Sequence, residues 1–481
     1  MGAGCLISVY MVEFRDQILL EPESKPTEVY RQYQSEVISI VPLLSGGPSI
    51  YTNNLDVARQ VISGAHKTSF TKPEYASEAL LLWGMNLIAA DGDIWRKHRR
   101  VMGPAFSNRL YEYVWNESIR TFNEMLASDG WLDKKSIDVP IVQRITFKFA
   151  LFIIGKCAFG LSFKWSEPPT GPDGTLSLQE ALRLTTDTFL TMILTPKWAF
   201  KLPIERLRKA KQAHDQLLGF MQEQVDERKK EIRNGTSQRD DVFTRLVQAN
   251  EDEESKFRLG DDELIGNVFI MLFAGHETTA HTLAATLGFL AYHSEIQEEV
   301  YEHILFVIGK TRDPVWDDFN KLEKVIAVFF ESLRLFPSGH VMIREAREDT
   351  VLTVPNLGGL EGTRGIPVSK GTEVVVDMIG VQYNSRYFDE PEKFKPSRWY
   401  GVPAESEMFT AFSVGPRACL GRKFGMTESI AFLTLLLRGW RVEPLLSGGE
   451  TKEQWKQRVL DAELVITLGV ANMPIRFTRR N

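Results

Sequence analysis

FSVGPRACLG, residues Phe412–Gly421, is the stretch of this chain that carries most information about its fold. It places a lone cysteine, Cys419, in a loop punctuated by glycine and proline, directly before an apolar run over Gly425–Leu437 with helical periodicity. The start of a helix presents unpaired backbone N–H groups and the positive end of the helix dipole, and Arg417 adds a further positive charge. The loop therefore favours the thiolate form of Cys419.

The glycines and the phenylalanine of this loop indicate a flat ligand beside the cysteine. Gly415 and Gly421 let the backbone approach such a ligand closely, and Phe412 can pack against it. A free cysteine taken alone is more often an inert core residue. Cys157, in the apolar context GKCAFG, keeps that interpretation, whereas the neighbours of Cys419 reverse it.

The loop resembles the cysteine loop of the cytochrome P450 superfamily, whose pattern is Phe-x-x-Gly-x-Arg-x-Cys-x-Gly. The residues that match its specified positions are Phe412, Gly415, Arg417, Cys419 and Gly421. The resemblance, closest to the fungal-like microsomal type, implies a mainly α fold with small β-sheets. It also implies one haem-binding domain over residues 1–481, with a long central helix over the haem. The implied cofactor is haem b (iron protoporphyrin IX), and Cys419 is the implied axial ligand of its iron.

Length and composition limit the alternatives. The 481 residues are 43% hydrophobic and 25% charged, which allows a large core, and the net charge of -6 offers no basic face for nucleic acid. The three cysteines, Cys5, Cys157 and Cys419, are too scattered for a CxxC site or a disulfide framework. The apolar run Cys5–Val12 is shorter than the roughly 20 residues of a membrane-spanning helix, so we expect no transmembrane anchor in this chain.

Periodicity predicts a mostly helical chain with a few short strands. Helices are predicted near Asp93–Asn108, Val142–Phe159, Leu176–Leu194, Ile204–Arg233 and Asp261–His293. Strands are predicted near Ser49–Tyr51, Thr350–Val354, Thr372–Asp377 and Leu464–Leu468. No charged or Pro/Gly-rich stretch is long enough to divide domains, so a single domain is expected.

The motif ESLR places Glu331 and Arg334 at i and i+3 near the end of a helix closed by Pro337. The resemblance implies that Glu331, Arg334 and Arg398 of FKPSRW form a structural triad that braces the cysteine loop. The same Glu-x-x-Arg spacing recurs elsewhere, where we expect ordinary solvated surface pairs. These copies begin at Glu28, Glu117, Glu180, Glu205 and Glu361.

The motif AGHETT, Ala274–Thr279, places polar groups inside a long apolar helix. Threonines in such a helix can simply bond back to carbonyls four residues earlier. The resemblance implies instead an opened helical turn that leaves room for oxygen, with Glu277 as the acid and Thr278 as the alcohol that relay protons to it. Zinc hydrolysis is disfavoured, because His276 and His281 are five residues apart and therefore point about 140° apart on a helix.

The motif DIWRKHRR places Trp95 and Arg99 at i and i+4 on one helix face. A generic basic face is the simpler interpretation, but the resemblance implies that Trp95 and Arg99 hold the haem propionates. Arg344 and Arg417 fall at further positions where the family contacts propionates. Nearby cations form a candidate docking patch for an acidic reductase, although solvated surface residues explain them equally well. This patch comprises Lys97, Arg100, Arg422 and Lys423.

The resemblance implies a monooxygenase that activates O2 with electrons from NADPH-cytochrome P450 reductase, with cytochrome b5 as a further partner. The substrate is expected to be lipophilic, because the segments that line the pocket in this family are mostly apolar here. The implied location is the cytoplasmic face of the endoplasmic reticulum membrane, with peripheral contact through Thr195–Pro203. Two alternatives stay open: a haem-thiolate isomerase, dehydratase or peroxygenase, and a non-catalytic haem-binding protein.

Overall fold

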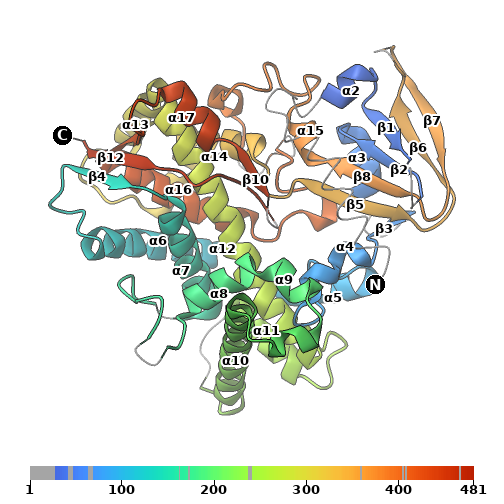
Figure 1. Ribbon diagram of the computed structural model, residues 1–481, viewed down its shortest axis with the longest axis horizontal. Helices are drawn as coiled ribbons and strands as arrows, with labels where there is room; N and C mark the ends of the chain where they lie inside the picture. Colours follow the sequence, from blue (N-terminus) through green and yellow to red (C-terminus); the bar gives the residue numbers. More distant parts are fainter. Residues whose placement is uncertain are drawn as a thin grey trace. The chain divides into compact units, whose positions relative to one another are not determined.

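The middle of the chain is almost entirely helical, and most of the short strands lie before residue 72 or after residue 340; Figure 1 labels many of these elements. The structure, a computed structural model, describes residues 28–41, 47–62, 69–161, 163–171, 174–236, 241–357, 360–403, 406, 409–464 and 467–480. Cys5 and the run Cys5–Val12 lie outside these residues. Within them, no helix combines the length and the apolar character needed to cross a bilayer.

Contacts between residues gather the chain into two units, which are described separately. The first comprises Met1–Ala76, Ala327–Cys419 and Leu460–Ala471. The second comprises Ser77–Ile326, Leu420–Val459 and Asn472–Asn481. The single catalytic domain expected over residues 1–481 stays a prediction.

A five-stranded sheet in the order β1-β2-β8-β5-β3 organises the first unit. Its central strand, β8, pairs in parallel with β2 and antiparallel with β5. The run Val374–Val376 of β8 is fully buried, as expected for a strand covered on both faces. The strands of this sheet are β1 (Val37–Ile40), β2 (Ser49–Thr52), β3 (Phe70–Thr71), β5 (Val341–Ala346) and β8 (Glu373–Asp377).

Short helices and two hairpins complete the first unit. The hairpins are β6 (Thr350–Pro355) with β7 (Thr363–Val368), and β10 (Ala462–Leu464) with β11 (Leu468–Val470). The helices are α2 (Glu28–Gln32), α3 (Leu55–Ile62), α15 (Met378–Gln382), η6 (Pro396–Trp399) and η7 (Gly415–Arg417). Two more helices cross the boundary of the units, namely α4 (Tyr75–Glu78) and α14 (Glu323–Leu335).

The second unit is built around α12 (Asp261–Tyr292), which is apolar on nearly every side and buried along most of its length. Its most extensive helical neighbour is α7. A small sheet in the order β4-β12-β9 completes this unit. The remaining helices are η1 (Ala79–Leu81), α5 (Gly92–Met102), η2 (Gly103–Ala105), α6 (Asn108–Ser128), α7 (Gln143–Phe159), α8 (Leu178–Asp187), α9 (Phe189–Leu194), η3 (Lys197–Lys201), α10 (Glu205–Arg233), α11 (Val242–Glu251), α13 (Ser294–Ile308), η4 (Trp316–Lys321), α16 (Arg422–Gly439) and α17 (Lys452–Val459). The strands are β4 (Ser136–Val139), β9 (Trp440–Pro444) and β12 (Ile475–Arg479).

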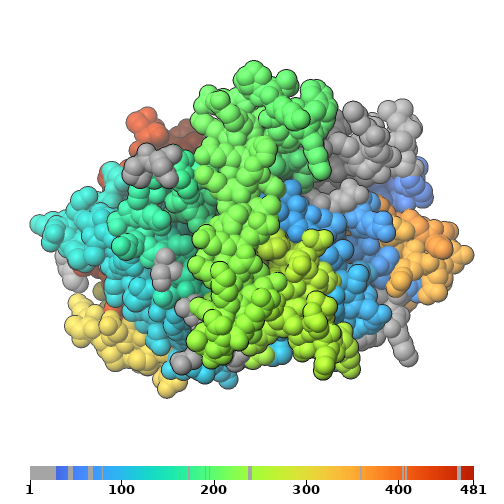
Figure 2. Space-filling model, turned by 90° about the horizontal axis from the view of Figure 1, so that it is seen from below, coloured from blue at the N-terminus to red at the C-terminus, as the bar shows by residue number. Residues whose placement is uncertain are grey.

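Helix α10 is amphipathic in its packing. It buries one narrow stripe at helical spacing, including Ala213, Leu217 and Met221, and most of its charged side chains are exposed, although Arg228 is buried. In Figure 2, the green residues of α10 accordingly lie at the surface of the face seen from below. Helices α8, α9 and α11 pack against α10 (Figure 1).

Most predicted elements are confirmed, with informative exceptions. The helix predicted over Asp93–Asn108 ends at Met102, because Pro104 cannot continue the hydrogen-bond ladder. The helix predicted over Leu176–Leu194 is divided into α8 and α9 at Thr188, whose hydroxyl bonds back to the carbonyl of Leu184. The strand predicted over Leu464–Leu468 is instead the end of a hairpin, in which Leu464 pairs with Leu468.

The chain segment after η1 crosses α12 at a glycine. A Cβ added at Gly266 would lie 2.6 Å from the carbonyl oxygens of both Gly84 and Met85. Next to this crossing, the backbone N–H of Leu87 donates to Oδ1 of Asn267, the residue after Gly266, over 2.9 Å. The crossing therefore depends on close approach of two backbones, which only glycine permits.

We expect Gly266→Ala to lower the free energy of unfolding by about 1 to 3 kcal/mol, because backbone atoms cannot move aside as a flexible side chain would. Gly219→Ala is the matched control, since it is also a helical glycine but has no atom within 4 Å of the added Cβ. It should raise stability by up to about 1 kcal/mol through helix propensity. Thermal unfolding of the two variants measures the difference. Equal melting temperatures would contradict this account.

Candidate functional site

The cysteine loop closes on itself through backbone hydrogen bonds. The N–H of Cys419 donates to the carbonyl of Phe412 over 2.9 Å, and the turn η7 lies between them. Gly415 has a φ of 69°, which glycine adopts without strain, whereas Ser413 has a φ of 64° and adopts it at a cost. The Cys419 side chain is exposed at the end of this loop. Helix α16 begins three residues later.

A buried carboxylate, Glu331, lies at the centre of the predicted triad. Arg334 binds it with both arms of its guanidinium, Nε to Oε2 and Nη2 to Oε1, each over 2.9 Å. Nε of Arg398 donates to Oε1 over 3.0 Å. Both Glu331 and Arg334 have no exposed surface. The structure therefore brings the three predicted triad residues together.

The charges of the triad are satisfied by further donors and acceptors. Two more donors reach Glu331, the backbone N–H of Lys395 over 2.9 Å and the indole Nε1 of Trp399 over 2.8 Å. Further N–H groups of Arg334 and Arg398 donate to backbone carbonyls from the last residue of α15 to the segment before η6. These carbonyls belong to Gln382, Pro391 and Lys393 for Arg334, and to Asp389 and Glu390 for Arg398. Charges removed from water need such complete pairing to be tolerated.

Aromatic rings connect the triad to the cysteine loop, a link that the sequence did not predict. Trp399, which donates to Glu331, packs edge-on against Phe409 with ring centroids 5.1 Å apart. Phe409 in turn contacts Phe412 at 5.7 Å, and Phe412 accepts the hydrogen bond from Cys419. Phe330, the neighbour of Glu331, stacks on Phe409 at 4.0 Å. The sequence feature that could have indicated this link is Trp399, the tryptophan that ends FKPSRW.

In the second unit, a polar network ties α5 to the first turns of α12. Lys97 forms an ion pair with Glu263 over 2.6 Å, and Nε2 of His98 lies 3.1 Å from the same carboxylate. Nδ2 of Asn267 lies 3.2 Å from Nδ1 of His98. Burial lowers the pKa of His98, so its neutral ring donates to Glu263 and accepts from Asn267. This network holds α5, the helix that carries Trp95, against the first turns of α12.

Glu277 and Thr278, the predicted proton-relay residues, lie on an unbroken part of α12. The predicted opened turn is wrong for this structure, since α12 is helical from Asp261 to Tyr292. The Thr278 hydroxyl instead donates to the carbonyl of Ala274 over 3.0 Å, within the helix. Glu277 is buried.

The two histidines of HETTAH are packed in the interior. Both His276 and His281 contact the ring of Phe147 edge-on. Burial lowers the pKa of each histidine to about 4, so both rings are neutral at pH 7. His276 Nδ1 lies 2.8 Å from the carbonyl of Leu272. Both histidines therefore make the contacts expected of packed side chains.

The predicted propionate residues are divided between the two units. Trp95 and Arg99 lie one turn apart on α5 in the second unit. Arg344 lies on β5 and Arg417 in η7, both in the first unit. All three arginines are half-buried.

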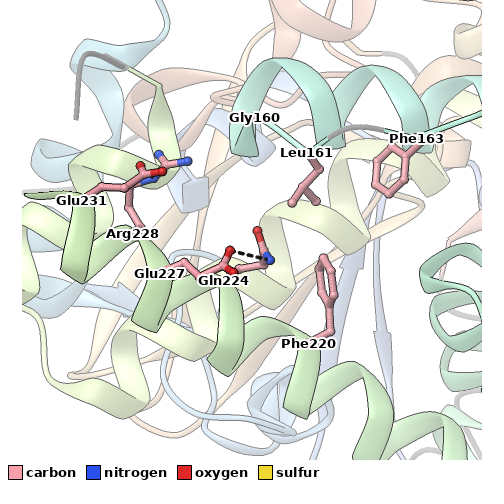
Figure 3. A pocket seen from close by; sticks show the side chains of 8 residues that line it. All are labelled: Gly160, Leu161, Phe163, Phe220, Gln224, Glu227, Arg228 and Glu231. Atoms are coloured by element: carbon pink, nitrogen blue, oxygen red, sulfur yellow. Dashed lines mark hydrogen bonds and ion pairs between the residues drawn. The ribbon is translucent and has the colours of Figure 1, made fainter. Parts of the chain in front are cut away.

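A cavity of about 300 Å³ in the second unit is lined by residues that follow α7 and by residues of α10. Figure 3 shows its lining side chains. None of the predicted site residues lines it. Its arginine, Arg228, is engaged by Glu231 and Asp241 and by the carbonyl of Phe159. The cavity is therefore a polar groove separate from the predicted chemistry.

Comparison with protein families decides the identity. The cytochrome P450 family model matches residues 13–466. The chain belongs to the cytochrome P450 family. Cytochrome P450 monooxygenase 124 of Postia placenta is 37% identical over 422 residues, covering 86% of this chain and 80% of its own length. A cytochrome P450 monooxygenase of Arthrobotrys oligospora is 27% identical over 483 residues, covering 88% and 80%.

Solved structures agree on the cytochrome P450 fold. The P450DA haem domain has a TM-score of 0.74 at 21% identity and covers 94% of this chain and 92% of its own. A zebra fish cytochrome P450 solved with progesterone has a TM-score of 0.72 at 21% identity and covers 94% and 98%. The mainly α fold with small sheets is thereby confirmed. Membership makes this P450 an oxidoreductase of the monooxygenase type, with a haem, a redox partner, a substrate and O2.

The residues of this P450 fit a haem. Cys419 offers a soft sulfur donor at an exposed position, whereas Cys157 is buried and its thiol pKa is raised well above its usual value by burial. Half-buried arginines and an indole suit carboxylates such as propionates.

We expect Arg334→Ala to abolish stable haem incorporation and to cost about 3 to 5 kcal/mol, because Glu331 would be left buried and unpaired. The matched control is Arg183→Ala, which breaks the Glu180–Arg183 pair of identical spacing; those side chains are 22% and 51% exposed. That change should cost at most about 1 kcal/mol. Haem content per polypeptide and melting temperature measure both. A full haem complement in Arg334→Ala would refute the bracing role.

Proposed function

We propose that this P450 takes electrons from NADPH-cytochrome P450 reductase and inserts an oxygen atom from O2 into a lipophilic substrate. The observation that carries the proposal is the braced cysteine loop, in which an exposed Cys419 follows a closed turn supported by Glu331, Trp399 and Phe409. An inert cysteine would need no such support.

Each predicted site residue has a role in this proposal. Haem b, when bound, supplies the activation of O2 and the transfer of one oxygen atom to carbon, while the other atom leaves as water. Cys419 would be its thiolate ligand, and Phe412 would pack against its ring. Its propionates would be held by Trp95, Arg99, Arg344 and Arg417. Glu331, Arg334 and Arg398 keep the loop in position and take no part in the chemistry.

Protons reach the oxygen site through α12 in this proposal. Glu277 is a buried acid, and the adjacent Thr278 carries a hydroxyl that can exchange its bond to Ala274 for one to a ligand. A side chain that changes partners in this way can hold a proton at Oγ1 and pass it on. The apolar residues Ile270 and Phe273, on the turn before, support a lipophilic substrate.

The reductase would dock on a smaller patch than the sequence indicated. Lys97 is paired with Glu263 and is therefore engaged within the protein. Arg100 is exposed, although its guanidinium also lies 4.8 Å from the ring of Phe257. Lys423 packs over the rings of Tyr111 and Trp316. Arg100, Arg422 and Lys423 remain the proposed contact for acidic reductase and cytochrome b5 surfaces.

Peripheral membrane contact is supported by the segment around η3. Trp198 is 67% exposed, Leu202 41% and Ile204 46%, beside Lys197 and Lys201. Exposed aromatic and aliphatic side chains flanked by lysines suit the interface of an anionic bilayer. We therefore propose the cytoplasmic face of the endoplasmic reticulum as the location.

Cys419→Ala should lose the strongly red-shifted Soret band that the reduced wild-type protein gives with carbon monoxide, because the thiolate ligand is removed. Cys157→Ala is the matched control and should keep the band, since this cysteine is buried in the core. The visible spectrum measures both. A wild-type band of the histidine-ligated type would overturn the proposal.

Thr278→Ala should bind haem normally but divert electrons to peroxide, lowering product formed per NADPH by roughly 10²-fold, as loss of a positioned proton donor does. Thr286→Ala is the control, since its hydroxyl makes the same bond to a carbonyl four residues earlier on α12. With isotope-labelled O2, a wild-type product carrying one labelled atom separates monooxygenation from isomerisation and from peroxygenation. Unchanged coupling in Thr278→Ala would remove the relay role.

A further inference from the structure

A buried indole N–H in the second unit lacks an acceptor. Trp83, in the segment between η1 and α5, is 8% exposed, and among the described residues its Nε1 has no hydrogen-bond partner. The buried indoles of Trp115 and Trp455 instead donate to backbone carbonyls over 3.2 and 3.1 Å. A buried donor without an acceptor lowers stability, so its presence in a folded protein calls for an explanation.

Aromatic neighbours hold the Trp83 ring on two sides. The ring stacks on His214 of α10, with ring centroids 4.7 Å apart, and packs edge-on against Phe269 of α12 at 4.3 Å. Turning the N–H toward solvent would break both contacts, and aromatic pairs stabilise a structure beyond the area that they bury. The indole is therefore fixed in orientation against both helices.

The backbone that carries Trp83 is also fixed. A Cβ added at Gly84 would lie 2.3 Å from the carbonyl oxygen of Asp262, so the chain touches the first turn of α12. Nδ2 of Asn86 donates to the carbonyls of Leu80 and Gly84 over 2.7 and 3.2 Å and closes the segment on itself. Trp83 is therefore a preorganised donor, which loses little entropy when an acceptor binds.

The surroundings of this donor select the kind of acceptor. Phe269 stacks in turn on Phe273 at 5.7 Å, and Phe273 is one of the apolar residues assigned to the lipophilic substrate. A hydrocarbon beside these rings would leave the Trp83 N–H unpaired. A carboxylate would exchange its water for a single neutral donor, at a high cost in free energy. A neutral carbonyl oxygen can accept the bond, which the low dielectric of apolar surroundings strengthens.

We propose that Trp83 determines substrate specificity by donating a hydrogen bond from Nε1 to a neutral carbonyl oxygen of the lipophilic substrate. The substrate class is then apolar ketones and esters, in preference to hydrocarbons of the same shape. This inference rests on the proposed function. It adds one polar contact to a substrate site otherwise described by apolar side chains, and such a contact fixes the orientation of a ligand as well as its selection.

Matched ligand pairs separate this hydrogen bond from the loss of a ring. Shifts of the Soret band of the haem-loaded protein give dissociation constants for cyclododecanone and cyclododecane, and for fluorenone and fluorene. Trp83→Phe should weaken binding of the ketones by roughly five- to tenfold more than that of the hydrocarbons, because all four ligands lose the same ring but only the ketones lose a donor. Trp455→Phe is the matched control and should leave the ratio unchanged. An unchanged ratio in Trp83→Phe would overturn the proposal.

The carbonyl stretch of a bound ketone reports the bond in the wild type alone, so this second test does not depend on how well a variant folds. With an isotope-labelled carbonyl carbon, the infrared band should lie at lower frequency than in a hydrocarbon solvent. An unshifted band, or no binding by either ketone, would defeat this inference alone, since the N–H would then serve water or nothing. A wild-type protein without the thiolate-type carbon monoxide band would instead defeat the proposed function.

Discussion

A single enclosed carboxylate, Glu331, supports the cysteine loop. Five donors converge on it, from Arg334, Arg398, Trp399 and the backbone at Lys395. Removing such a charge from water is tolerable only because every lone pair is used. Arg334 and Arg398 also donate to backbone carbonyls between the end of α15 and η6. The conformation of that segment therefore depends on the ion pairs with Glu331. The loop that carries Cys419 rests on that segment through Trp399 and Phe409.

In the second unit, buried polar groups hold the start of α12 in place. A hydrogen-bond network connects α5 to this helix through His98, Glu263 and Asn267, and at Gly266 the backbone of α12 lies in close contact with another segment. Farther along, polar side chains interrupt an otherwise apolar helix. Their hydroxyls are satisfied by carbonyls one turn earlier, as with Thr278, so the helix continues without a break. The proposed proton relay would therefore depend on side chains that can exchange one hydrogen-bond partner for another.

The cysteine loop and the triad could be predicted because specified residue types occur there at fixed spacings. The role of Trp399 could not, although it is adjacent to Arg398, because packing among Phe330 and Phe409 brings its indole to Glu331. Lys97 looked like a solvent-facing cation, but Glu263 lies far away in the sequence and binds it. The opened turn of α12 was wrong because the helix supplies its own acceptors. The hairpin at Leu464 likewise depends on strand pairing that periodicity does not encode.

The enclosure of Glu331 also affects the rate at which this region folds. Its nearest partner, Arg334, is three residues away and is available as soon as α14 forms, whereas Arg398 and Trp399 are 67 and 68 residues away. Closing a chain loop of that length costs entropy before any contact repays it. Until it closes, the Glu331 charge keeps its water, and the rings that support Cys419 have nothing to pack on. In the proposed bracing role, closure of this loop would precede stable capture of the cofactor, so a haem-free population would report slow loop closure as well as scarcity of haem.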